Sequence, residues 1–230
     1  MRLLILCLTL LSGPASAVEF ISYSGRVSDE AFYRMVACAA PPGGSCTKPF
    51  TRWPVYKSER LTVGIALVNA DFPDYKRAWV EAALGGAVAE INSVGADIRL
   101  RLVDDGSSVD IPVFLTGTAR GGVIRDTGFR GLDGSTIQAG LMTLWWRNGE
   151  IRASGIALSK DLRRRSIRSV VLEELVQALG LATDLRNPAY AKRSIFDEDS
   201  NAVIRLTGQD AEALRRHYPR RVGVTSNASD

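Results

Sequence analysis

The sequence has very few of the side chains that most often bind zinc in proteins. It contains one histidine, His217, and three cysteines among 230 residues. Zinc is held mostly by several imidazole or thiolate ligands, so we expect no zinc here. We assign no chemistry to His217, because it stands in the last turn of a predicted helix, where a histidine commonly interacts with the helix end.

Three further features are missing. Beyond residue 17, no apolar run reaches the ~18 residues that a membrane-spanning helix needs. Lys and Arg number 29 against 25 Asp and Glu, and a net charge of +4 is too small and too dispersed to indicate nucleic-acid binding. The glycine-rich segment 117–140 lacks a phosphate-binding motif, so we expect it to be a long loop at the edge of a cleft.

One local concentration of charge stands just before the central helix described below. It consists of Arg163, Arg164, Arg165 and Arg168. Two interpretations remain open, a solvated face or a contact with an anionic envelope surface or acidic partner.

The first 17 residues are typical of a secretory signal peptide. Arg2 precedes an apolar run, and Ala15-Ser16-Ala17 predicts cleavage before Val18. Cys7 lies inside the apolar run, so a lipid anchor is not expected. The protein is therefore expected to be periplasmic or secreted, and its polar tail, 225–230, to be disordered.

In an exported protein the two remaining cysteines, Cys38 and Cys46, predict a disulfide across a Pro/Gly turn. The bridge would pin an N-terminal arm, residues 18–56, which precedes a main domain at 57–224. Within the arm, 28–38 is predicted to be a helix capped by Ser or Asp.

Hydrophobic patterning predicts the elements of the main domain. Strands are expected at 61–68, 97–103 and 109–115, with Ile98, Leu100 and Leu102 on one face, and a packed helix at 75–91. A hairpin, 140–147 and 150–158, is expected around Asn148-Gly149. Trp145 and Trp146 then point to opposite faces, so at least one should be buried.

The central feature is a helix predicted over 169–184. Between Val170 and Leu181 its only polar residues are Glu173, Glu174 and Gln177. At i, i+1 and i+4 they project within about 100°, which predicts one polar patch lining a cleft on a helix that is otherwise buried. Gly180 is expected to end the helix.

This patch follows the spacing of the zinc-peptidase motif HExxHxxGxxH without its histidines. Glu173 and Gln177 stand at the first two ligand positions, and Glu174 stands at the general base. Thr183 stands at the third ligand position, and Asp184 is the nearest further oxygen ligand. An all-oxygen set suits calcium better than zinc, and we expect no resident cofactor.

The order of these elements, with the helix after the hairpin, resembles that of the metzincin-type zinc peptidases. Ser194-Ile195-Phe196 is similar to their Met-turn, and 206–218 is similar to their closing helix. The resemblance spans roughly 61–218 and implies an α+β fold. It implies a mixed sheet with packed helices, in which the strand before the active-site helix is an edge that aligns peptide.

The helix motif Glu173–Leu181, the Ser-Ile-Phe turn and the cysteine arm more closely resemble an uncharacterised family of exported proteobacterial proteins, some of them proposed lipoproteins. That resemblance implies a metzincin-like scaffold without the histidines, and no activity.

Three hypotheses about function follow. The leading one is a non-catalytic binding protein that holds an extended peptide or a cell-envelope component in the former substrate cleft, by strand addition. The alternative is a hydrolase, either an atypical metallopeptidase or a carboxylate-based enzyme, that uses Glu174. The third is a purely structural envelope protein with no specific ligand. If the two glutamates are not catalytic, we expect one of Glu173 and Glu174 to accept hydrogen bonds from loops and the other to meet an arginine.

Overall fold

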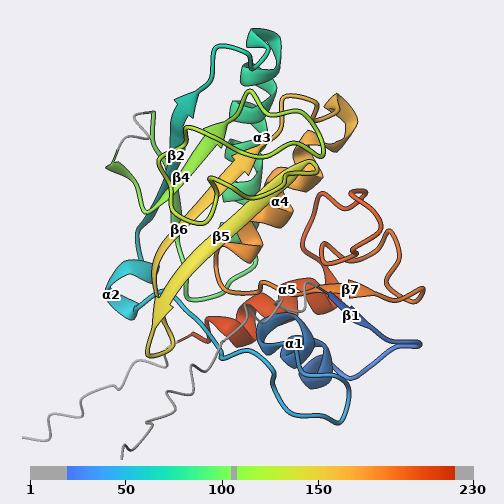
Figure 1. Cartoon of the computed structure of the whole chain (residues 1–230). Helices are drawn as coiled ribbons and strands as arrows, with labels where there is room; N and C mark the ends of the chain where they lie inside the picture. Colours follow the sequence, from blue (N-terminus) through green and yellow to red (C-terminus); the bar gives the residue numbers. More distant parts are fainter. Residues whose placement is uncertain (1–19, 105–107, 221–230) are drawn as a thin grey trace, which may run out of the picture.

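The computed structural model describes residues 20–104 and 108–220 (Figure 1). The predicted signal peptide and the predicted tail lie outside these ranges, so both stay predictions. In the described part of the chain, no helix is long and apolar enough to span a bilayer.

A mixed five-stranded sheet forms the centre of the molecule (Figure 1). Its strands are β2 (Leu61–Val68), β3 (Leu100–Leu102), β4 (Ile111–Leu115), β5 (Gly140–Arg147) and β6 (Glu150–Leu158). They lie in the order β3-β2-β4-β6-β5, and only β5 runs antiparallel to its neighbour. The expectation of helices packed on a mixed sheet is therefore confirmed.

Two expectations about the strands need correction. β3 is shorter than predicted and pairs only with residues 61–63 of β2, so Leu102 is 38% exposed instead of sharing a buried face with Ile98. The strand directly before the central helix is β6, which has neighbours on both sides. The edges of the sheet are β3 and β5, and β5 precedes β6 in the chain.

The hairpin has the predicted bounds, but neither tryptophan is buried. Asn148 and Gly149 both have positive φ, 53° and 76°, as a tight hairpin turn requires. A register shift between Trp145 and Trp146 breaks the alternation of side chains, and β5 lies at the edge. The two rings therefore remain 37% and 48% exposed, and the Trp145 indole donates to the carbonyl of Arg130 at 3.0 Å.

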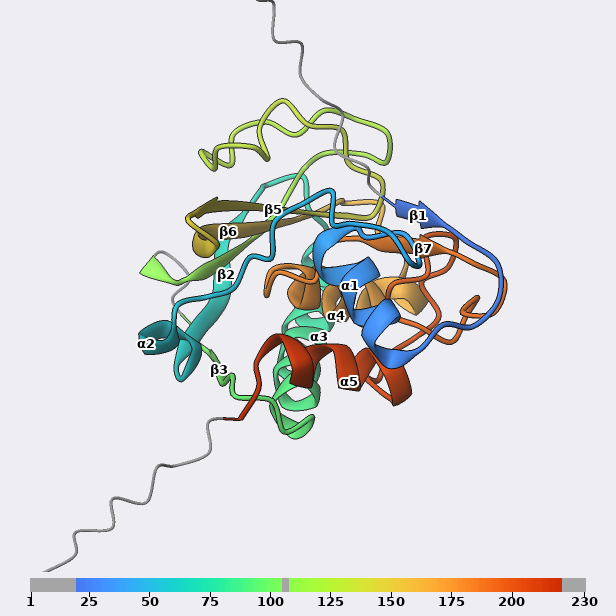
Figure 2. The same ribbon diagram turned by 90° about the horizontal axis from the view of Figure 1, so that it is seen from below.

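Helices cover one face of the sheet and a long loop covers the other (Figure 2). The helices are α3 (Asp74–Ser93) and α4 (Ile167–Gln177), which pack against each other. The loop, expected at a cleft edge, encloses a second, smaller core. That core contains Phe114, Ile124, Leu132, Ile137 and Ala157.

The N-terminal segment and the C-terminal elements pack together beside α4 (Figures 1 and 2). They comprise β1 (Phe20–Ser22), α1 (Asp29–Cys38), β7 (Asp184–Arg186) and α5 (Gly208–His217). The short helix α2 (Val55–Ser58) lies apart from them, just before β2. Strand β1 pairs with β7, and α1 packs on α5. The predicted cap Ser28 accepts from the N–H of Ala31, and Cys38 and Cys46 form the predicted disulfide. The segment predicted as an arm thus contributes to the main core, for example through the fully buried Phe32.

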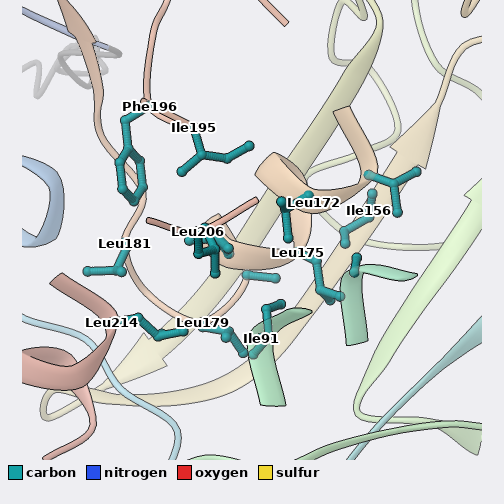
Figure 3. Packing of buried hydrophobic residues seen from close by; sticks show 14 of the residues in the cluster. Ile91, Ile156, Leu172, Leu175, Leu179, Leu181, Ile195, Phe196, Leu206 and Leu214 are labelled. Atoms are coloured by element: carbon teal, nitrogen blue, oxygen red, sulfur yellow. The ribbon is translucent and has the colours of Figure 1, made fainter. Parts of the chain in front are cut away.

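Helix α4 is covered on nearly all sides, as its apolar sequence requires (Figure 3). Leu172 and Leu175 lie in one cluster with Ile91 of α3, Ile156 of β6 and Leu214 of α5. Each fully buried leucine stabilises the fold by about 1.5–3 kcal/mol relative to an exposed one. Helix α4 therefore packs in one core with α3, β6 and α5.

The helix ends at Gln177, earlier than predicted. Side chains from other segments donate to the carbonyls that directly follow it. Trp53 Nε1 donates to Ala178 O at 3.0 Å, and the hydroxyl of Tyr218 donates to Leu179 O at 2.7 Å. Gly180, the predicted terminator, has φ of 103°. A Cβ at this position would clash with the carbonyl oxygen of Thr51.

His217 lies in the last turn of α5, as predicted, and is completely buried. Its Nε2 lies 2.9 Å from the carbonyl of Thr51 and therefore donates, so Nδ1 accepts from the hydroxyl of Tyr33 at 3.3 Å. Burial, followed by the charge of Arg52, lowers the pKa of His217 to about 3. The neutral ring links α5 to the N-terminal segment.

We predict that Gly180→Ala lowers the free energy of unfolding by about 3 kcal/mol or more, because it combines an unfavourable φ with a backbone clash. Gly86→Ala is the matched control, since Gly86 lies inside α3 with open space around it. Urea unfolding should show the control to be as stable as the parent or slightly more so. Equal stability of the two variants would contradict the packing described here.

Candidate functional site

The structure brings the four predicted site residues together. Glu173, Glu174 and Gln177 lie on α4, and Asp184 approaches them from β7. Gln177 Nε2 donates to both carboxylate oxygens of Asp184, at 2.9 and 3.1 Å. Asp184 therefore stands beside the patch, on a strand separate from the helix.

Glu174 is the buried centre of this cluster. Its residue is 7% exposed, and its carboxylate accepts the backbone N–H of Met142 in β5. A Cβ on Gly140 would overlap the carboxylate, so only glycine lets the start of β5 approach α4 this closely. Burial and then the charge of Asp184 raise the pKa of Glu174 to about 8, against the opposing effect of the Met142 hydrogen bond. At neutral pH this carboxyl is mostly protonated.

Glu173 is partly accessible and faces the segment after β7. Its Oε2 accepts from Asn201 Nδ2 at 2.8 Å. Loss of hydration and the charges of Glu174 and Asp184 raise the pKa of Glu173 well above its ordinary value. The expectation that one of the two glutamates would meet an arginine is wrong, because no ion pair in the described ranges involves either.

The remaining ligand positions do not converge. Thr183 is buried, and its hydroxyl lies 3.4 Å from the Nζ of Lys48. Glu173 and Gln177 bond to different partners, Asn201 and Asp184. Within residues 20–104 and 108–220, no group of three or more His, Cys, Asp or Glu could hold a metal ion.

The Ser194-Ile195-Phe196 turn is anchored by the closing helix α5. Asp210 accepts from the hydroxyl of Ser194 at 2.7 Å and from the N–H of Ile195 at 2.8 Å. Burial raises the pKa of Asp210 to about 6, although both hydrogen bonds favour its charged form. Ile195 and Phe196 are buried in the same core as Leu172 of α4 (Figure 3).

A basic cavity of about 680 Å³ adjoins the carboxylates. We use this name for the space lined by Arg120, Arg163, Arg165 and Lys192 together with Gln138, Ala139 and Asn201. Asn201 belongs both to this lining and to the hydrogen bond with Glu173. The arginine concentration seen in the sequence is thus divided, since Arg164 stacks instead on Trp79, 4.7 Å from the ring centroid.

Sequence reasoning missed the residues that surround the glutamates. Met142 and Asn201 donate to them, and the charge of Glu198 also acts on Glu173. The one available signal was Gly140, because a glycine at a strand terminus often marks a close backbone approach.

The raised pKa of Glu174 predicts a pH-dependent stability. Folded protein keeps this proton up to about pH 8, whereas an unfolded glutamate loses it near 4.5, so stability falls as pH rises between these values. Glu174→Gln can still accept from Met142 without a charge. We expect a shallower slope, with the variant more stable than the parent at pH 9, and a residual slope from Glu173.

The measurement is urea unfolding between pH 5 and pH 9. Glu81→Gln serves as the control, because Glu81 is an exposed residue paired with Arg77. If the free energy of unfolding of Glu174→Gln falls with pH as steeply as that of the parent and of the control, Glu174 is ionised in the folded protein.

One family profile matches part of this chain. Residues 129–227 match the profile of a family described as a protein of unknown function, DUF2927. No match to a curated protein is found. The matched part of the chain contains β5, β6, α4 and α5, and therefore the carboxylate cluster and much of the basic cavity.

Proposed function

We propose that this protein is a non-catalytic binding protein that holds an extended peptide along the outer edge of β5, outside the cytoplasm. The observation that carries the proposal is the position of β5. The strand is 8 residues long, it is last in the sheet, and it pairs on one side only with β6. An extended peptide satisfies the outer N–H and C=O groups of such a strand.

The arrangement around β5 supports a metzincin-like scaffold. An antiparallel edge strand lies beside a buried helix, followed by an anchored Ser-Ile-Phe turn and a closing helix. The sequence resemblance implies these parts, except that the edge strand is β5 and not the strand directly before the helix. We therefore propose that the peptide lies where substrate lies in those peptidases, with the catalytic ligands replaced.

The hydrogen bonds of the carboxylate cluster favour binding over catalysis. Glu174 is almost fully buried and is engaged in holding the start of β5, while Gln177 is bonded to Asp184. A general acid or base must reach the proton that it transfers. In this arrangement the side chains of the former active site are structural supports for the edge strand.

The free part of the edge begins after Met142. The N–H of Met142 bonds to Glu174 and therefore points away from β6. In an antiparallel strand the backbone N–H groups of every second residue point the same way, so the N–H of Leu144 also points away from β6. Pairing with a peptide is therefore expected from Leu144 toward Arg147.

We predict that Leu144→Pro weakens peptide binding about tenfold, because it removes an outward N–H and leaves the bonds to β6 intact. Leu144→Ala is the matched control, which loses the same side chain but keeps the N–H. Fluorescence anisotropy with a labelled library of random peptides of about eight residues provides the measurement. Equal affinity of the two variants would show that peptide does not pair with this edge.

One observation favours the alternative, a hydrolase. A carboxyl whose pKa lies near 8 can act as an acid at neutral pH, as catalytic carboxyls do. Our proposal predicts no turnover of peptide or glycan panels by the parent protein, and unchanged peptide binding in Glu174→Gln. Turnover by the parent that disappears in a folded Glu174→Gln variant would establish the enzyme instead.

A further inference from the structure

The basic cavity lies at one end of the edge strand. Gln138 and Ala139 line it, and the chain continues from them directly into Gly140, the first residue of β5. Residues 163–166, between β6 and α4, line the cavity from a second segment. A ligand that leaves the free edge at Leu144 and continues past Met142 toward the beginning of β5 therefore reaches this cavity.

The charges of the cavity are positive on balance. In the described ranges, the exposed side chains of Arg163, Arg165 and Lys192 form no ion pair. Two carboxylates also line the space, but both are engaged. Asp199 pairs with Arg186 at 3.2 Å, and Asp161 accepts the backbone N–H of Arg120 at 3.0 Å. The cavity therefore attracts anionic groups.

Lys192 is held at the cavity in an unfavourable backbone conformation. Its φ is 57°, in the left-handed region that residues other than glycine rarely adopt. The buried carboxylate of Asp197 fixes this conformation by accepting the N–H of Lys192 at 2.7 Å. Local strain of this kind persists only where the surrounding structure enforces it, and it is common at ligand sites.

The direction of β5 determines which end of a bound peptide meets these charges. The strand runs from Gly140 to Arg147, so the cavity lies at its N-terminal end. A peptide paired antiparallel to β5 brings its C-terminal end there. A parallel peptide would bring a cationic α-amino group into the same positive cavity, which the charges disfavour.

We propose, on the basis of the function proposed above, that the peptide binds antiparallel to β5 and that the basic cavity receives its anionic C-terminal end. The ligand is an extended chain with a free α-carboxylate and acidic final side chains. From Leu144 to Ala139 the distance along the strand is about 17 Å, so the last four or five residues of the peptide extend from the paired edge into the cavity.

The test compares two fluorescent peptide libraries of about eight residues, identical except at the C-terminus. One library ends in Asp-Asp with a free carboxylate, and the other ends in Asn-Asn with an amide. We expect the mature protein to bind the acidic library at least about tenfold more tightly, and this preference to weaken with added salt.

The preference should fall to within about twofold in the variant Arg163→Ser/Arg165→Ser/Lys192→Asn. Asparagine is chosen at Lys192 because it tolerates the left-handed conformation. The control is Arg60→Ser/Arg205→Ser, which removes two exposed charges that do not line the cavity and should keep the full preference. Thermal unfolding of all variants verifies that they are folded.

Equal affinity of the parent for the two libraries, or an undiminished preference in the triple variant, would overturn the inference. If both libraries bind equally and Leu144→Pro weakens both, strand addition stands and only the role of the cavity is wrong. If neither library binds, the proposed function fails together with the inference. Binding to phosphatidylglycerol vesicles through the same three side chains, without acidic-peptide binding, would assign the cavity to a lipid headgroup and overturn the peptide assignment.

Discussion

The contact between the Glu174 carboxyl and the first residues of β5 is the interaction on which the rest of the site depends. Helix α4 is apolar on nearly every side, so it must be buried, and burial leaves its few polar groups in need of partners. The N–H of Met142 at the sheet edge provides one, and Gly140 allows the approach. This contact places the beginning of β5, and with it the basic cavity, beside the carboxylate cluster.

Several elements could be predicted from the sequence because their signals are local. The apolar run with three polar residues defines α4, alternating residues around Asn148-Gly149 define the hairpin, and two cysteines in an expected exported chain define the bridge. The positive φ at Gly180 could also be predicted from a local signal, because glycine commonly adopts this conformation just past the end of a helix.

The features that were missed depend on residues far apart in the chain. The exposure of Trp145 and Trp146 follows from a register shift and from the place of β5 in the sheet, neither of which periodicity reveals. Asp184 was predicted only as a nearby oxygen ligand, whereas it begins a strand that pairs with β1, which lies far away in the sequence. The donors to Glu173 and Glu174 come from separate segments, so no local pattern could name them.

We propose that the strand β5, and not the helix α4 beside it, carries the function of the protein. Glu174 lies against the beginning of β5, and we propose that the open backbone of this strand and the basic cavity at its end are the binding surface. Amide hydrogen exchange of Leu144, followed by NMR with and without the tightest acidic-ended peptide, tests this claim most directly. The account predicts that saturating peptide slows this exchange by at least about tenfold. An unchanged rate at saturation would contradict it.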